Sequence, residues 1–142
     1  MSPPDPPAIV VVAAVIERDD CFLVTRRLEG THLAGTWEFP GGKREPGESD
    51  GECLVREIEE ELGTGAVVER LMYATTHAYP DRVVELRFYA CDIEGEPLPM
   101  LGQRMQWVPR DELGTLEFPP ADGELIGILR RGDASTPRNR GS

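Results

Sequence analysis

The chain has 142 residues, of which 39% are apolar, and its 26 acidic and 15 basic side chains give a net charge of −11. A chain of this length and composition folds as a water-soluble domain with a sizeable core, which excludes disordered and membrane-spanning classes. The acidic balance argues against a nucleic-acid polymer as partner, because proteins that bind the phosphate backbone carry a basic surface.

Cysteine use and the amino-terminal residues indicate the compartment. Cys21, Cys53 and Cys91 are widely spaced, odd in number and without metal-ligand spacing, so we expect reduced, packed thiols. The apolar run at residues 8–16 is too short to cross a bilayer and lacks the preceding Lys or Arg of a signal peptide. We therefore expect a cytoplasmic protein that does not contact membranes.

We expect one domain at residues 8–131, between a disordered leader at residues 1–7 and a disordered polar tail at residues 132–142. The continuously apolar residues 8–17 predict a buried strand, and residues 21–27 predict the strand that returns beside it.

Residues 30–51 contain eight glycine and proline residues, which predicts a long functional loop with an extended piece at 37–39. After a central helix, the remaining predicted elements are strands at 66–79, 82–92 and 103–108, a helical turn at 109–113 and a terminal helix at 119–131. This order predicts an α+β fold of the α/β/α sandwich type.

The central helix is predicted at residues 50–62. Ser49 and Glu52 have the spacing of a capping box, and Gly63 provides the stop. Its apolar residues recur every four positions, at Leu54, Ile58 and Leu62.

This helix also carries an acidic face. At 100° per residue, Glu57, Glu60 and Glu61 fall in one arc, and Leu54, Val55 and Ile58 fall opposite them. A solvated acidic face explains most such runs, but here the glycine pair Gly41–Gly42 comes shortly before the helix. Glycines let the backbone approach a ligand closely, and Mg²⁺ takes oxygen ligands that it shares with phosphates. The pattern therefore predicts a site for Mg²⁺ and a phosphate.

Residues 42–64 resemble the Nudix box, Gly-x5-Glu-x7-Arg-Glu-U-x-Glu-Glu-x-Gly-U, where U is a bulky apolar residue. All seven fixed positions match, namely Gly42, Glu48, Arg56, Glu57, Glu60, Glu61 and Gly63; only Thr64 departs, at the last apolar place. The resemblance implies that Mg²⁺, with Mn²⁺ as a substitute, is held by the Gly42 carbonyl, Glu48, Glu57, Glu60 and Glu61. It implies a catalytic set of Arg56, Glu57, Glu60 and Glu61, in which Arg56 orients Glu57.

Further segments, at residues 25–27, 37–43, 79–82 and 118–122, resemble the MutT branch of this family. That branch has a mixed sheet between helices and hydrolyses nucleoside triphosphates to monophosphates and pyrophosphate, which removes oxidised guanine nucleotides from the pool. The substrate-binding residues implied by this resemblance are Arg27, Phe39, Lys43, Asp81, Arg82 and Asp122.

Several of these residues have a second interpretation. Phe39 is equally suited to the core, and Lys43 to a solvated surface. The oxidised-guanine enzymes carry Asn in place of Asp122; Asn donates and accepts hydrogen bonds, whereas an ionised Asp only accepts. A carboxylate suits the exocyclic amine of cytosine, so CTP or a modified dCTP is the second candidate substrate, and Asp122 as a plain helix cap is the third possibility.

One departure from the branch concerns Leu101, which stands where the family has a Glu near the metal or the attacking water. Glu85, Glu94 and Glu96 are candidates to replace it. Leu101 alone favours a nucleotide-binding regulatory domain without catalysis, whereas the complete set of helix carboxylates favours an enzyme. Hydrolysis of nucleotide sugars or dinucleoside polyphosphates is a weaker alternative, and both a monomer and a homodimer remain open.

Overall fold

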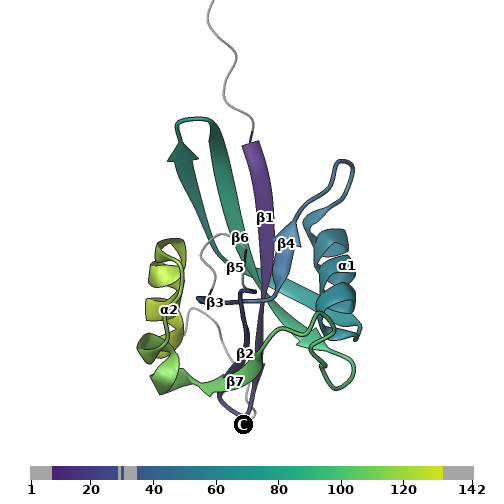
Figure 1. Ribbon diagram of the computed structural model, residues 1–142, viewed down its shortest axis with the longest axis vertical. Coiled ribbons are helices and arrows are strands. Elements are labelled where there is room, and N and C mark those ends of the chain that lie inside the picture. Colours follow the sequence, from purple (N-terminus) through teal and green to yellow (C-terminus); the bar gives the residue numbers. More distant parts are fainter. Residues whose placement is uncertain (1–7, 29, 31–34, 133–142) are drawn as a thin grey trace, which may run out of the picture.

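The structure is a computed structural model that describes residues 8–28, 30 and 35–132. A seven-stranded mixed sheet lies between two helices, one on each side (Figure 1), which confirms the α+β sandwich. The expectations for residues 1–7 and 133–142 lie outside the described residues. Among the described helices, none has the length and apolar character needed to cross a bilayer.

Most elements begin and end within one or two residues of the prediction. In chain order they are β1 (Ala8–Arg18), β2 (Cys21–Arg26), β3 (Trp37–Glu38), β4 (Gly41–Lys43), α1 (Asp50–Leu62), β5 (Ala66–Tyr79), β6 (Arg82–Ile93), β7 (Met105–Pro109), the 3₁₀ turns η1 (Arg110–Thr115) and η2 (Pro120–Asp122), and α2 (Gly123–Arg130). Strand β4 was not predicted, because its three residues lie inside the glycine-rich loop.

Strand β1 is the centre of the sheet. It pairs in parallel with β6 and antiparallel with β2 and β4. Its alternate residues enter two different cores: Val12, Ala14 and Ile16 pack with α1, and Ala13 and Val15 pack with α2. A strand covered on both faces is apolar at every position, which explains the continuous run in the sequence.

Helix α1 has the predicted caps. The Ser49 hydroxyl accepts a hydrogen bond from the Glu52 N–H at 3.1 Å, the Glu52 carboxylate accepts one from the Ser49 N–H at 2.9 Å, and Gly63 is left-handed with φ of 69°. The prediction that Val55 belongs to the apolar face is wrong, because Val55 is 44% exposed and Cys53 is buried in the core instead.

The predicted terminal helix at 119–131 divides in two. Pro119 is extended, and the Asp122 N–H donates to its carbonyl at 2.9 Å, so the chain passes through a 3₁₀ turn before α2 begins. Strand β7 starts two residues later than predicted, at Met105, which pairs with Thr25 of β2.

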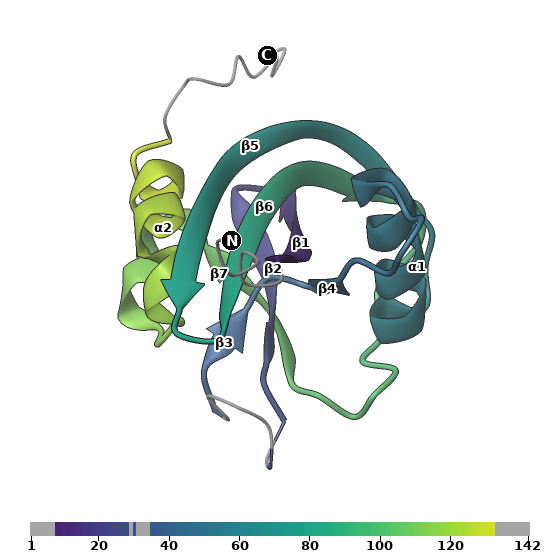
Figure 2. The same ribbon diagram turned by 90° about the horizontal axis from the view of Figure 1, so that it is seen from above.

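Strands β5 and β6 form a long curved hairpin (Figure 2). Its tip lies beside the beginning of β1, since Val83 is the register partner of Ala8. Two irregularities in the pairing, between Val68 and Arg70 and between Leu71 and Tyr73, accompany the curvature.

The close approach of β4 to β1 gives a stability prediction. A Cβ on Gly41 would lie 2.1 Å from the Val12 carbonyl oxygen, whereas a Cβ on Gly51, in the first turn of α1, would meet nothing within 4 Å. We expect Gly41→Ala to lower the free energy of unfolding by about 1–3 kcal/mol. Gly51→Ala should raise it by up to about 1 kcal/mol, because alanine favours helix. Urea unfolding of both variants measures the change in the free energy of unfolding. Equal changes in the two variants would contradict the close approach of β4 to β1.

Candidate active site

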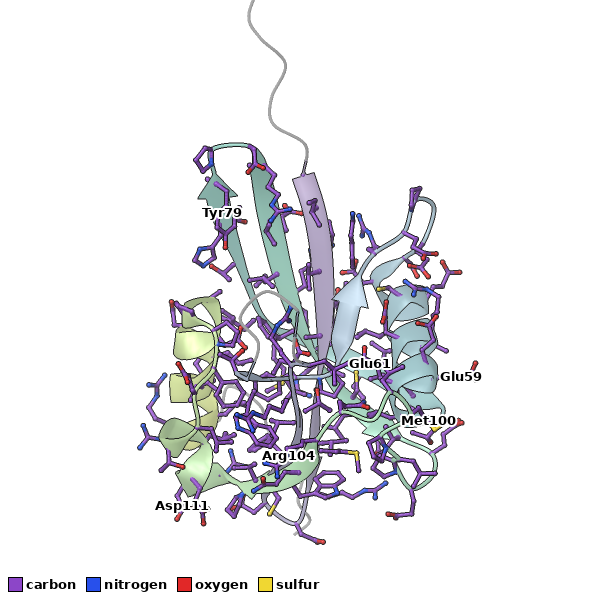
Figure 3. All side chains as sticks on the ribbon, viewed as in Figure 1. Glu59, Glu61, Tyr79, Met100, Arg104 and Asp111 are labelled. Atoms are coloured by element: carbon purple, nitrogen blue, oxygen red, sulfur yellow. The ribbon has the colours of Figure 1, made fainter. Side chains whose placement is uncertain are left out.

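Two carboxylates of α1 face the sheet. Glu57 and Glu61 lie among the buried positions of the helix, between Cys53 and Ile58 on the helical wheel, and not opposite them as the sequence suggested. Figure 3 shows the difference in direction: Glu61 points toward the strands, whereas Glu59 lies on the outer side of α1. The expected arc of three glutamates therefore reduces to a pair.

The glycines of β4 make room for this pair. A Cβ on Gly42 would lie 2.5 Å from the Glu57 carboxyl, so a larger residue there would displace that carboxyl. The Glu61 carboxylate accepts a hydrogen bond from the Gly41 backbone, and the two carboxyls are within hydrogen-bonding reach of each other. Backbone and carboxylates thus meet at the place that the Nudix resemblance implies.

Burial, with the negative charges of Glu57 and Glu38, raises the pKa of Glu61 to about 9. The ionised pair is therefore unfavourable unless a proton or a cation lies between the oxygens. This electrostatic demand is the observation that favours a metal ion.

Arg56 holds the neighbouring acids in place. Its Nε and Nη2 donate to both oxygens of Glu48, at 2.6 and 2.9 Å, and its Nη1 donates to Glu57 at 2.9 Å. Hydrogen bonds from Arg56, followed by one from the Glu45 N–H, lower the pKa of Glu48 to about 2. Glu60 has a side chain 57% exposed and lies 3.6 Å from Arg56.

The expected metal ligands lie in different surroundings. Glu48 and Glu57 both accept hydrogen bonds from Arg56, and the Glu60 side chain is more exposed; the full ligand set stays a prediction. No group of three or more His, Cys, Asp or Glu side chains in the described part of the chain is arranged to hold a metal by itself. Mg²⁺ is usually held by one or two carboxylates and completes its shell with water and substrate phosphates. Glu57 and Glu61 fit that mode of binding.

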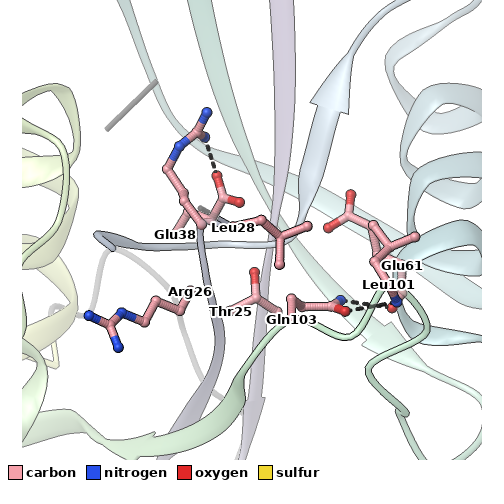
Figure 4. Close-up of a pocket in the computed structure, with 8 residues that line it drawn as sticks. Thr25, Arg26, Leu28, Glu38, Glu61, Leu101 and Gln103 are labelled. Carbon is pink, nitrogen blue, oxygen red and sulfur yellow. Dashed lines mark hydrogen bonds and ion pairs between the residues drawn. The ribbon is translucent and has the colours of Figure 1, made fainter. Parts of the chain in front are cut away.

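A pocket of about 120 Å³ opens beside Glu61 (Figure 4). Glu38 lies across the pocket from Glu61 in Figure 4 and forms an ion pair with Arg27 at 2.6 Å. The lining residues are Thr25, Arg26, Arg27, Leu28, Glu38, Glu61, Leu101 and Gln103. A guanidinium across from a carboxylate pair can neutralise an anion that also binds a metal ion.

Asp122 lies close to the Arg27–Glu38 pair. It is only 6% exposed, and burial with the nearby charge of Glu38 raises its pKa to about 7 although Arg27 acts in the opposite direction. Its side chain makes no capping hydrogen bond to α2, so the interpretation as a plain helix cap is wrong.

Four other expected substrate residues are not gathered at the pocket. Phe39 is buried, stacked on Phe118 with ring centroids 5.5 Å apart, so its side chain belongs to the core. Asp81 and Arg82 are exposed at the tip of the β5–β6 hairpin, beside Ala8, whereas Gly41 pairs with Ala13. Ala8 and Ala13 are five residues apart along β1, which corresponds to roughly 16 Å, so the hairpin tip lies far from Gly41. Lys43 is exposed at the end of β4.

Leu101 lines the pocket with a side chain 56% exposed. None of the acids that were candidates to replace the family Glu is a lining residue. Glu85 pairs with Arg87, Glu96 pairs with Arg18, and Glu94 lies against Gly65.

Sequence reasoning missed two residues of the site. Glu38 is a half-buried acid between two aromatic residues, and that alternation was the available signal. Gln103 is 7% exposed; its amide donates to the Glu61 carbonyl at 3.0 Å and accepts from the Leu101 N–H at 2.9 Å. Nothing in its sequence neighbourhood indicated this link.

Comparison with known proteins gives concordant results. A family profile described as NUDIX domain matches residues 11–127. The 8-oxo-dGTP diphosphatase of Haemophilus influenzae is 39% identical over 124 residues, 85% of this chain and 91% of that protein. The CTP pyrophosphohydrolase of Escherichia coli is 37% identical over 130 residues, which cover 91% of this chain and 96% of that protein. The solution structure of the E. coli ORF135 protein superposes with a TM-score of 0.82 at 34% identity, covering 94% of this chain and 96% of that one.

The raised pKa of Glu61 predicts how stability depends on pH. Because the folded pKa of about 9 lies above the ordinary value of 4.5, the folded state binds the extra proton between these limits. The stability of the metal-free protein should therefore fall as pH rises from about 5 to 9. Glu61→Gln should flatten this slope, as thermal unfolding in chelator at several pH values will measure. An equally steep slope in the variant would contradict the assignment.

Proposed function

The chain belongs to the NUDIX domain family, and from this premise we propose that it is a Mg²⁺-dependent pyrophosphohydrolase of nucleoside triphosphates. The observation that carries the proposal is the carboxylate pair Glu57–Glu61, packed against the β4 glycines, of which Glu61 lines a pocket that Arg27 also lines. A triphosphate with its bound cation complements both charges.

Each residue then has a definite role. Glu57 and Glu61 would hold Mg²⁺, which supplies charge neutralisation for the phosphates and acidifies a bound water. Arg27 provides a fixed positive charge for a phosphate oxygen, and Arg56 keeps Glu57 in position. In the reaction water adds to phosphorus and the bond to the pyrophosphate oxygen breaks, giving a nucleoside monophosphate and pyrophosphate.

An oxidised purine triphosphate such as 8-oxo-dGTP is the first candidate substrate. The similar protein of H. influenzae carries that activity in its name, and the pKa of about 7 at Asp122 supports it. A protonated carboxyl donates one hydrogen bond and accepts others, as an Asn side chain does.

CTP is the second candidate, since the ionised form of Asp122 only accepts, and cytosine offers a donor amine. The similar E. coli CTP pyrophosphohydrolase supports this alternative. A regulatory domain that binds without catalysis is less well supported, because the carboxylate pair is complete.

Turnover tests the proposal directly. The wild-type protein with Mg²⁺ should release pyrophosphate from at least one member of a nucleoside triphosphate panel. Glu57→Gln keeps the shape of the side chain but removes its charge, and should lower kcat by at least about a hundredfold. Glu59→Gln, on the exposed side of the same helix, is the matched control and should retain activity. Release of pyrophosphate at an unreduced rate by Glu57→Gln would exclude the mechanism.

Asp122 gives a prediction on substrate choice. If it contacts the base, the ratio of kcat/KM for 8-oxo-dGTP over CTP should fall as pH rises through about 7, because the carboxyl loses its donor proton. Asp122→Asn should remove this pH dependence and shift the ratio toward 8-oxo-dGTP by roughly tenfold to a hundredfold. An unchanged ratio in the variant at every pH would remove Asp122 from the recognition site.

A further inference from the structure

A second charged cluster lies on α1, away from the pocket. The carboxylate of Asp50, the first residue of the helix, accepts hydrogen bonds from Arg44 at 2.7 Å, from Arg87 at 2.9 Å and from the Tyr89 hydroxyl. Arg87 also pairs with Glu85 at 3.0 Å. The Asp50 side chain is only 11% exposed. None of these residues lines the pocket, and the proposed hydrolysis uses none of them.

The partners of Asp50 connect it to the glycines of the site by two routes. Arg44 directly follows β4, the strand that carries Gly41 and Gly42. Arg87 is the register partner of Val12 in β1, and Val12 is in turn the partner of Gly42. The amino-terminal end of α1 is thereby fixed to the strand and to the loop that place the glycines.

Asp50 also shares a helix face with the metal-binding pair. Glu57 and Glu61 follow it by seven and eleven residues, which is about two and three turns on one side of the helix. At the other end of α1, the Glu61 carbonyl accepts from the Met100 N–H and from Gln103, both at 3.0 Å. The helix is thus held at both ends. At its amino-terminal end Asp50 gathers three polar partners, next to two direct contacts of α1 with β4: the Cys53 thiol donates to the Gly42 carbonyl at 3.7 Å, and Arg56 donates to the Lys43 carbonyl at 3.3 Å.

We propose that Asp50 is a positioning residue of the metal site, through which Arg44, Arg87 and Tyr89 fix the place of α1 over β4 and hence the approach of Glu57 to Gly42. The inference rests on the proposed function, because it assumes that Glu57 and Glu61 hold the cation. Side chains that orient metal ligands from behind typically change metal affinity or activity by about 10–100-fold when they are replaced.

The test measures metal affinity apart from turnover. Asp50→Asn should weaken Mn²⁺ binding, followed by electron paramagnetic resonance without nucleotide, by about tenfold or more. The Mn²⁺ concentration for half-maximal hydrolysis should rise in parallel, whereas KM for the nucleotide at saturating metal should stay within roughly threefold, because Asp50 does not face the pocket. Tyr89→Phe, which removes one hydrogen bond and no charge, should give a smaller change in the same direction.

Two controls separate positioning from general destabilisation. Asp20→Asn makes the same chemical change at an ion pair with Arg110 in the β1–β2 turn, and should leave Mn²⁺ affinity unchanged. Leu129→Ala removes a buried side chain from the core between α2 and the sheet, on the face opposite α1. It should lower the melting temperature without weakening Mn²⁺ binding.

The outcomes distinguish the two proposals. If the wild-type protein neither binds Mn²⁺ nor hydrolyses nucleotides, the proposed function is wrong. If the wild-type protein does both and Asp50→Asn binds Mn²⁺ with unaltered affinity, the positioning role is overturned. Should Asp50→Asn not fold, Arg87→Gln together with Tyr89→Phe provides the same comparison, and unaltered affinity in both overturns the inference equally.

Discussion

The repulsion between Glu57 and Glu61 is the constraint on which the rest of this structure depends. Both carboxylates are directed at the sheet by a helix whose neighbouring positions are buried, and burial raises the pKa of Glu61. Such an arrangement is stable only with a proton or a cation between the oxygens. The glycines of β4 suit the same geometry, because a side chain at Gly42 would displace the Glu57 carboxyl.

The arginines explain how an acidic chain builds such a site. Each of three guanidiniums is committed to a carboxylate: Arg56 to Glu48, Arg27 to Glu38 and Arg87 to Asp50. Arginine suits these places because its planar fork makes two directed hydrogen bonds and keeps its charge when half-buried. Arg56 also donates to Glu57 at 2.9 Å, so it supports one member of the carboxylate pair as well as Glu48.

The sequence predicted those features that depend on local pattern. The capping box and Gly63 defined α1, the two-sided burial of β1 produced its continuous apolar run, and the spacing of the glutamates identified the family. The features it missed depend on contacts between distant segments. The links of Gln103 to Glu61 and of Asp50 to Arg87 join residues 42 and 37 positions apart. The expectation that Glu57 and Glu61 lie opposite the apolar residues was wrong because it counted the exposed Val55, and not the buried Cys53, as part of the apolar face; both glutamates lie between Cys53 and Ile58 on the wheel.

The net charge of the whole chain affects whether a nucleotide binds as a free anion or as a complex with a divalent cation. A protein of net charge −11 repels a free polyphosphate, and Glu38, Glu57, Glu61 and Asp122 add acidic groups near the pocket. A nucleotide that brings its own divalent cation reverses this interaction locally, since the cation is attracted to the pair that repels the phosphates. On the proposed function, few carboxylates are needed, because Mg²⁺ completes its shell with water and with the phosphates of the ligand. A site of that kind would favour the metal complex of its substrate over the uncomplexed anion.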